Sequence, residues 1–206
     1  MSEYEPAFGS ALATPRGEDD LAAVRRAFAA ASRPYLSTPV SWLAWAALLP
    51  AAALLTPVAG RLADLRGVVL LWCGAILLGG LIEGGALLAA RRRSGASPLG
   101  GWAMSLQGNL SLVGAALSAV LLALGGAHFL PGLWLLLLGH SFFALGSLAL
   151  PAMRQAGFLY QLGGVAALLP GVPPLVAFAV ASAAGNLWIA LAVGRRRYEE
   201  PASSSS

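Results

Sequence analysis

The segment "GVVLLWCGAILLGGLIEGGALLAARRR", residues 67–93, decides the fold. Residues 67–90 contain one carboxyl group, that of Glu83, and three arginines, Arg91–Arg93, follow them directly. An apolar run of about 20 residues is long enough to cross the roughly 30 Å hydrocarbon layer of a membrane as a helix. The segment therefore predicts a membrane-spanning helix that ends at a cluster of cations.

The composition of the whole chain agrees with this interpretation. Of its 206 residues, 58% are hydrophobic and only 11% are charged, whereas a soluble domain carries about 25% charged residues. All 13 basic residues are arginines, and they stand at the ends of apolar runs. The net charge of +4 therefore reflects membrane orientation and not a phosphate-binding surface. We expect the lipid bilayer as a partner and no nucleic acid.

The apolar runs predict an all-α membrane bundle with six transmembrane helices. Before the bundle we expect a disordered tail over residues 1–17 and a short amphipathic interfacial helix over 18–34, and after it a cytoplasmic tail over 195–206. Proline- and glycine-rich or charged segments separate the runs. The six predicted spans within the domain 39–194 are approximately 39–59, 67–90, 102–126, 132–150, 155–170 and 175–194.

The distribution of arginines predicts the orientation. If the N-terminus is inside the cell, only Arg61 and Arg66 fall in external loops, and the other eleven arginines fall in cytoplasmic segments. This asymmetry satisfies the positive-inside rule. It requires an even number of crossings, so both termini are expected in the cytoplasm of a bacterial cell, with the chain in the inner membrane.

Four polar side chains on four predicted spans are expected at a similar depth, about 8–12 Å from the cytoplasmic side by helix rise. A polar group that faces lipid is unfavourable, so these groups are expected to turn inward. They could form a site for a proton, a cation or a small polar ligand, or they could hold the helices together through hydrogen bonds. The sequence leaves both interpretations open, and the presence of a single embedded charge favours the second. The four residues are Glu83, Asn109, Gln161 and Asn186.

Small residues at helical spacing predict close helix contacts. Gly80 and Gly84 stand four residues apart on one face of the second span, and Ala177, Ala181 and Gly185 form a similar series on the sixth. Such faces allow helix backbones to approach closely. We interpret them as helix-packing positions inside the chain in preference to a dimer interface.

The sequence contains no recognisable catalytic motif, so we expect no enzyme activity, no metal site and no cofactor. The single cysteine, Cys73, cannot form an internal disulfide. The two histidines, His128 and His140, are expected about 12 Å apart in depth, which prevents them from binding one haem together. A haem site that pairs His140 with a ligand from another chain stays open as an alternative.

Two segments resemble a group of small bacterial multi-pass membrane proteins to which no activity is assigned. They are "VRRAFAAASRPYLSTPVSWLA" at residues 24–44, which leads into the first span, and "LPGLWLLLLGHSFFALGS" at residues 130–147, which opens the fourth. The resemblance implies six spans and a bacterial inner membrane, and it implies no active residues.

Three functional hypotheses follow from these features. The first is a non-catalytic accessory, scaffold or regulatory subunit that binds other membrane subunits or a second copy of the chain. The second is a small transporter or proton-coupled permease that uses the polar residues around Glu83. The third is a haem- or quinone-binding redox subunit that involves His140.

Overall fold

The structure is a computed structural model that describes residues 19–20, 23, 39–94, 98–146 and 150–199. The predicted N-terminal tail and nearly all of the predicted amphipathic helix lie outside the described residues. The described residues contain helices and no strand, which confirms the all-α class. The elements are α2 (Pro39–Ser94), α3 (Pro98–Ala123), the short 3₁₀ helix η1 (Ala127–Phe129), α4 (Leu130–Gly146), α5 (Pro151–Leu168) and α6 (Pro174–Glu199).

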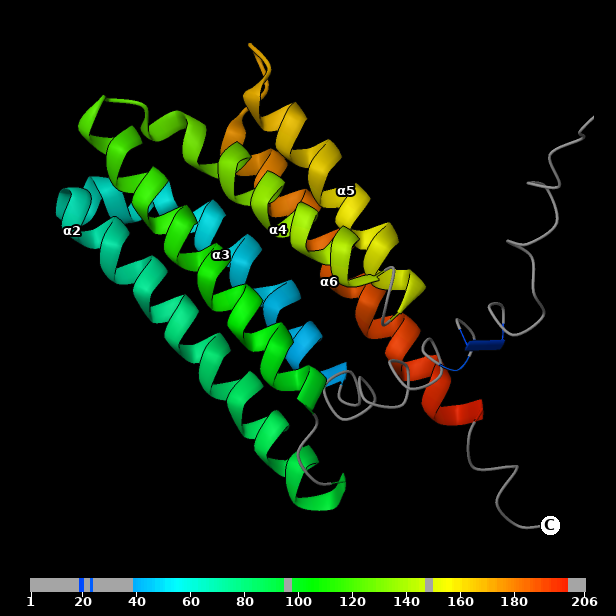
Figure 1. Cartoon of the computed structure of the whole chain (residues 1–206). Helices are drawn as coiled ribbons and strands as arrows, with labels where there is room; N and C mark the ends of the chain where they lie inside the picture. Colours follow the sequence, from blue (N-terminus) through cyan, green and yellow to red (C-terminus); the bar gives the residue numbers. More distant parts are fainter. Residues whose placement is uncertain (1–18, 21–22, 24–38, 95–97, 147–149, 200–206) are drawn as a thin grey trace, which may run out of the picture.

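The helix α2 is broken in its middle and folds back on itself. Ala63 and Asp64 leave the helical region of backbone space, and Asp64 has a φ of 49°. A positive φ is uncommon for a residue other than glycine, and aspartate tolerates it better than most. Figure 1 shows the two halves, residues 39–62 and 65–94, running side by side in opposite directions from this break. The break lies in the charged segment that the sequence predicted as an external loop.

The other helices form two further hairpins. α3 and α4 are joined through Gly125 and η1, and α5 and α6 are joined through Gly171. Gly125 has a φ of 73° and Gly171 a φ of 83°, which are conformations that glycine adopts without steric cost. The reversal within each of the three hairpins lies at the same end of the molecule (Figure 1), which we call the turn end. We call the opposite end, where α2, α3 and α5 begin and α6 finishes, the open end.

Tryptophan side chains form hydrogen bonds across the α2 hairpin and across the α3–α4 hairpin. In α2 the indole of Trp45 donates a hydrogen bond to Glu83 at 3.0 Å, and the indole of Trp72 donates to Thr56 at 3.0 Å. The equivalent bond from Trp134 to Ser118 is 3.1 Å long. An indole N–H in apolar surroundings needs an acceptor, so these bonds hold the paired helices in register.

Glycines allow α4 and α5 to pack closely. Gly132, Gly139 and Gly146 recur every seven residues along α4 and face α5, where Gly157 and Gly164 have the same spacing. A Cβ atom added to Gly139 would lie only 2.8 Å from the carbonyl oxygen of Gly157. Any larger residue at these positions would force the two backbones apart.

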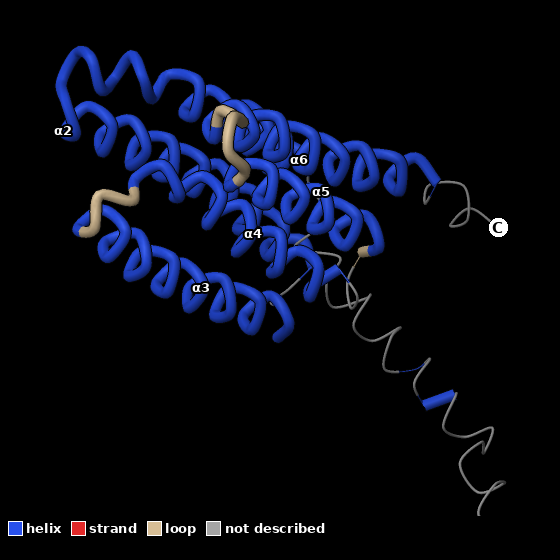
Figure 2. Tube along the Cα trace, turned by 90° about the horizontal axis from the view of Figure 1, so that it is seen from above, coloured by secondary structure: helices blue, strands red, loops and turns tan. Residues whose placement is uncertain are grey.

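The core lies between α4, α5, α6 and the first half of α2. We call these elements the packed side. Leu135, Tyr160 and Ile189 are fully buried there. The ring of Phe142 packs edge-on against Tyr160, with 5.3 Å between the ring centroids. Seen from above, α3 lies along the margin of the bundle opposite α6 (Figure 2).

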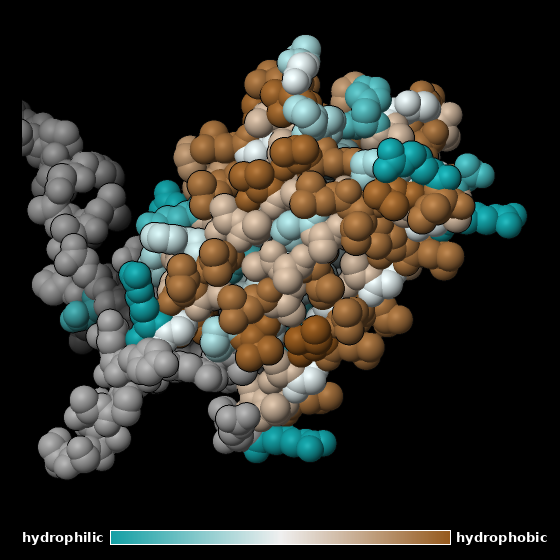
Figure 3. Space-filling view, turned by 180° about the vertical axis from the view of Figure 1, so that it is seen from behind, coloured by the Kyte–Doolittle hydropathy of each residue, from teal (hydrophilic) through white to brown (hydrophobic). Residues whose placement is uncertain are grey.

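The second half of α2 together with α3 forms what we call the exposed side. Large apolar side chains there are mostly uncovered, for example Leu70 at 72% and Leu112 at 69% exposed. Apolar side chains also dominate the other face of the molecule, which Figure 3 shows from behind. In water such a surface would be unfavourable, whereas in a membrane lipid tails or other helices cover it.

Among the described residues, four helical stretches are long and apolar enough to cross a membrane, which is the pattern of an integral membrane protein. α5, with Arg154, Gln155 and Gln161, is not one of them. The count of six crossings stays a prediction. The four stretches are Pro39–Arg92, which contains the break in α2, Ser105–Ala123, Ala127–Gly146 and Pro174–Arg195.

Candidate functional site

A buried polar group lies between α5 and α6. Asn186, which is only 1% exposed, donates a hydrogen bond from its amide nitrogen to the hydroxyl oxygen of Tyr160 at 2.8 Å. The Tyr160 hydroxyl is 3.5 Å from the backbone carbonyl of Ser182, to which it donates. The Ser182 hydroxyl donates in turn to the carbonyl of Ala179 at 3.2 Å. These bonds satisfy polar atoms that would otherwise be costly to bury.

Glu83 lies in a different contact, between the two halves of α2. Its side chain is half-buried and accepts the hydrogen bond from Trp45. The Trp45 ring lies against Gly79, where an added Cβ would overlap it. The absence of a side chain at Gly79 thus makes room for the ring that reaches Glu83.

The remaining two predicted polar residues lie elsewhere. Asn109 is on an exposed face of α3. Gln161 is partly buried on α5, where its side chain lies beside Gly139 of α4. The structure therefore does not bring the four predicted residues together. It pairs Asn186 with Tyr160 and Glu83 with Trp45, and it leaves Asn109 exposed.

A second polar contact joins α3 to α4. Ser141, which is buried, donates a hydrogen bond to the side-chain oxygen of Gln107 at 3.1 Å. The sequence did not identify Gln107 or Tyr160 as candidate residues, nor Ser141, Ser182 or Trp45 as hydrogen-bond partners. A usable signal existed, because Trp45 and Glu83 lie equally far along the chain from the break at Asp64.

The predicted small-residue positions behave in two different ways. Ala181 and Gly185 face α5, where a Cβ added to Gly163 would overlap Ala181, and one added to Gly185 would overlap Tyr160. In contrast, a Cβ added to Gly80 or Gly84 would meet nothing within 4 Å. Ala177, also on α6, packs partly buried against the core cluster that includes Leu135 and Phe178. Among the described residues, close approach of helices therefore occurs on α6 and not at Gly80 and Gly84.

The histidines lie in exposed positions at different levels of the bundle. His128 belongs to η1 at the turn end, and His140 lies within α4. Because His140 is exposed, a ligand from another chain would have access to it. Three or more histidine, cysteine or carboxylate side chains do not come together anywhere in the described ranges.

Comparisons with protein-family models, with curated proteins and with solved structures found no match to this chain.

Proposed function

We propose that this chain is a six-span protein of the bacterial inner membrane that acts as a non-catalytic accessory, scaffold or regulatory subunit. It binds membrane-spanning helices of other proteins, or of a second copy, through its exposed side. The resemblance of residues 24–44 and 130–147 to bacterial multi-pass proteins supports the location.

The observation that carries this proposal is the unequal burial of the apolar helices. In an apolar 18-residue stretch of α6, 50% of the residues are buried inside the molecule, whereas in the corresponding stretch of α3 only 6% are buried. Gly80 and Gly84 on the second half of α2 face open space. Because helices in membranes associate through small residues that let backbones approach, this side is suited to bind another helix.

The charges at the two ends support the proposed orientation. Arg61 and Arg66 lie near the break of α2 at the turn end, whereas Arg91, Arg154 and Arg195 lie toward the open end. The positive-inside rule then places the open end, together with both chain termini, in the cytoplasm. In this arrangement each hairpin enters from the cytoplasm and returns to it, which gives six crossings.

The test is the size of the complex that a mild detergent extracts from native membranes. The wild-type chain is expected to migrate with a partner or a second copy, and the double variant Gly80→Leu/Gly84→Leu is expected to migrate alone. Gly74→Leu is the matched control, because Gly74 also faces open space but on another face of the same helix. A wild-type chain that migrates as a lone monomer with no co-purifying protein would overturn the proposal.

The second candidate function is transport coupled to Glu83. It is favoured by one observation, namely that a carboxyl group is held half-buried between apolar helices by an indole hydrogen bond. If Glu83 carries a proton or a cation, Glu83→Gln abolishes the uptake of protons or cations into proteoliposomes while the protein still folds. Uptake that is unchanged in this variant, or an absence of uptake in the wild type, would reject this candidate.

A further inference from the structure

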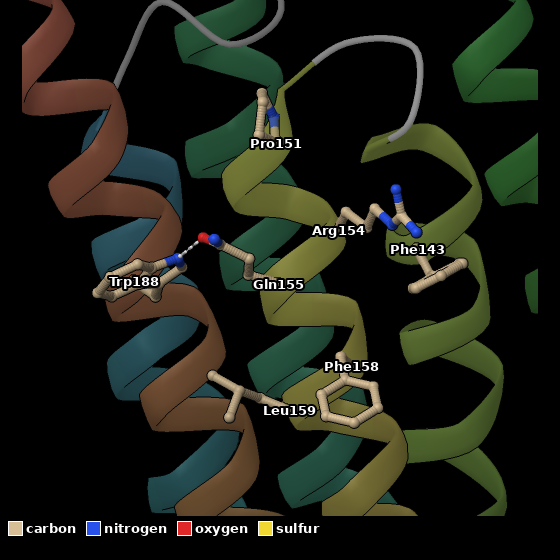
Figure 4. A pocket seen from close by; sticks show the side chains of 7 residues that line it. All are labelled: Phe143, Pro151, Arg154, Gln155, Phe158, Leu159 and Trp188. Atoms are coloured by element: carbon tan, nitrogen blue, oxygen red, sulfur yellow. Dashed lines mark hydrogen bonds between the residues drawn. The ribbon is translucent and has the colours of Figure 1, made fainter.

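A shallow hollow of about 650 Å³ lies over the outward face of α5 near the open end. In Figure 4, Arg154 reaches toward Phe143 of α4 on one flank, and Gln155 meets Trp188 of α6 on the other. The α5 residues are spaced three or four positions apart and so share one helix face. The lining consists of Phe143, Pro151, Arg154, Gln155, Phe158, Leu159 and Trp188.

The end of this hollow nearest Pro151, at the open end of the molecule, offers hydrogen-bond donors and a positive charge. The guanidinium carbon of Arg154 lies 4.9 Å from the centre of the Phe143 ring. The indole of Trp188 donates to the side-chain oxygen of Gln155 at 2.8 Å, which orients the Gln155 amide nitrogen as a further donor. Among the residues that the structure describes, no carboxylate forms a salt bridge with Arg154, and its guanidinium lies against the Phe143 ring.

From these polar groups toward the turn end, the same face of α5 is apolar and exposed. Phe158, Leu162 and Val165 are 53%, 52% and 52% exposed. From Phe158 to the end of α5 at Leu168 the helix rises about 15 Å, which is close to half of the roughly 30 Å hydrocarbon layer. The face therefore presents a cationic head region followed by an apolar track about one leaflet long.

We propose that this hollow binds an anionic phospholipid, with the phosphate group at Arg154 and Gln155 and one acyl chain along α5. The order of polar and apolar groups matches that of the lipid, and a guanidinium group can donate two parallel hydrogen bonds to phosphate oxygens. The inference rests on the proposed membrane location and is independent of the proposed helix-binding role of the exposed side.

The experiment is native mass spectrometry of the full chain in a mild detergent that contains equal amounts of phosphatidylglycerol and phosphatidylcholine with identical acyl chains. We expect the wild type to retain one phosphatidylglycerol molecule in preference to phosphatidylcholine, and Arg154→Gln to lower this preference about fivefold, as for one arginine at an anionic membrane surface. Arg195→Gln is the matched control, because Arg195 is an exposed arginine of α6 that does not line the hollow. It is expected to retain the wild-type preference.

Two further arms keep the test decisive. Phe158→Ala leaves the charge in place and is expected to lower retention through loss of contact with the acyl chain, so it serves even if Arg154→Gln fails to fold. Inorganic phosphate is added to the wild type and is expected not to displace the lipid. Equal retention of the two lipids by the wild type would overturn the proposal, and so would a loss of preference in Arg195→Gln as large as that in Arg154→Gln. Unchanged lipid retention in Phe158→Ala would also overturn it. Displacement of the lipid by phosphate would overturn it by indicating a free-anion site. None of these arms involves Gly80 or Gly84, so failure here is distinct from failure of the helix-binding proposal.

Discussion

The packed side and the exposed side are built from the same few residue types, mainly alanine, leucine and glycine, but they use glycine differently. At Gly139 and Gly157 the backbones of α4 and α5 nearly touch, whereas Gly80 and Gly84 face open space. The comparison shows that a glycine in an apolar helix has no fixed meaning. Its role depends on whether a neighbouring helix of the chain lies opposite it.

The two membrane asparagines show the same contrast. Asn186 is buried on the packed side and bonded to Tyr160, whereas Asn109 lies exposed on α3. Asparagine thus makes an internal contact on the packed side and lies at the surface on the exposed side. Substitutions that change the same residue type on both sides are therefore the way to test the difference.

The largest effect is expected from glycine substitution on the packed side. In Gly157→Leu the new side chain would meet the backbone of Phe143, and we expect a loss of about 3 kcal/mol in the free energy of unfolding from overpacking. Gly80→Leu on the exposed side should not lower it, because an added Cβ meets nothing within 4 Å there and leucine is favoured over glycine in a helix. Thermal unfolding of the detergent-solubilised protein measures both, and similar losses in the two variants would contradict the distinction.

A smaller effect is expected from the asparagines. Asn186→Leu removes the donor to Tyr160 within the core, which should cost about 2 kcal/mol of unfolding free energy. Asn109→Leu places an apolar side chain on an exposed face and should cost nothing in the same measurement. If Asn109→Leu is the more damaging of the two, Asn109 makes a contact that this account does not include.

The next effect concerns the bond that ties the exposed half of α2 to the packed half. Trp45→Phe removes the indole donor to Glu83 and should cost about 1 kcal/mol. Glu83→Gln keeps an acceptor oxygen and should cost less. The same unfolding measurement compares the two variants, and the reverse order would show that the charge of Glu83, and not the indole bond, stabilises the pair.

The smallest effect is expected from Gly84→Ala. Alanine is favoured over glycine in a helix by up to about 1 kcal/mol, and at this position the added Cβ meets no described residue within 4 Å. The isolated chain should therefore become slightly more stable. Gly185→Ala is the counterpart on the packed side, where the Cβ would overlap Tyr160, and it should lower stability.

The sequence predicted the features that depend on position along the helix axis. The long apolar runs indicated an all-helical membrane protein, and the charged segment around Asp64 marked the reversal within α2. Hydropathy and charge suffice here because the membrane imposes a length on each run and excludes charges from its interior. The number of crossings and their orientation stay predictions.

The sequence could not predict which way the side chains face around each helix. The estimate of depth grouped Glu83, Asn109 and Asn186, but the structure turns them toward Trp45, an exposed face and Tyr160. In a soluble helix an apolar stripe reveals the buried face. In these helices nearly every position is apolar, so that contrast is absent and only the packed neighbours decide the direction.

The seven-residue recurrence of glycine on α4 and α5 is a signal that could have been used. Gly132, Gly139 and Gly146 precede Gly157 and Gly164 at the same spacing. A period of seven keeps residues on one side of two interacting helices. This pattern predicts the α4–α5 contact. The pair of Gly80 and Gly84, four residues apart, predicted instead a helix contact on a face that the described residues leave open.

The most direct test of the central claim, that three hairpins cross the membrane with their turns on one side, is cysteine labelling in intact cells. In a Cys73→Ser background, single cysteines replace Arg66, Ala127 and Pro170, one near each reversal. The account predicts that a membrane-impermeant maleimide labels all three from outside, and that a cysteine replacing Arg195 is labelled only after permeabilisation. Labelling of the three turn positions from different sides of the membrane would contradict it.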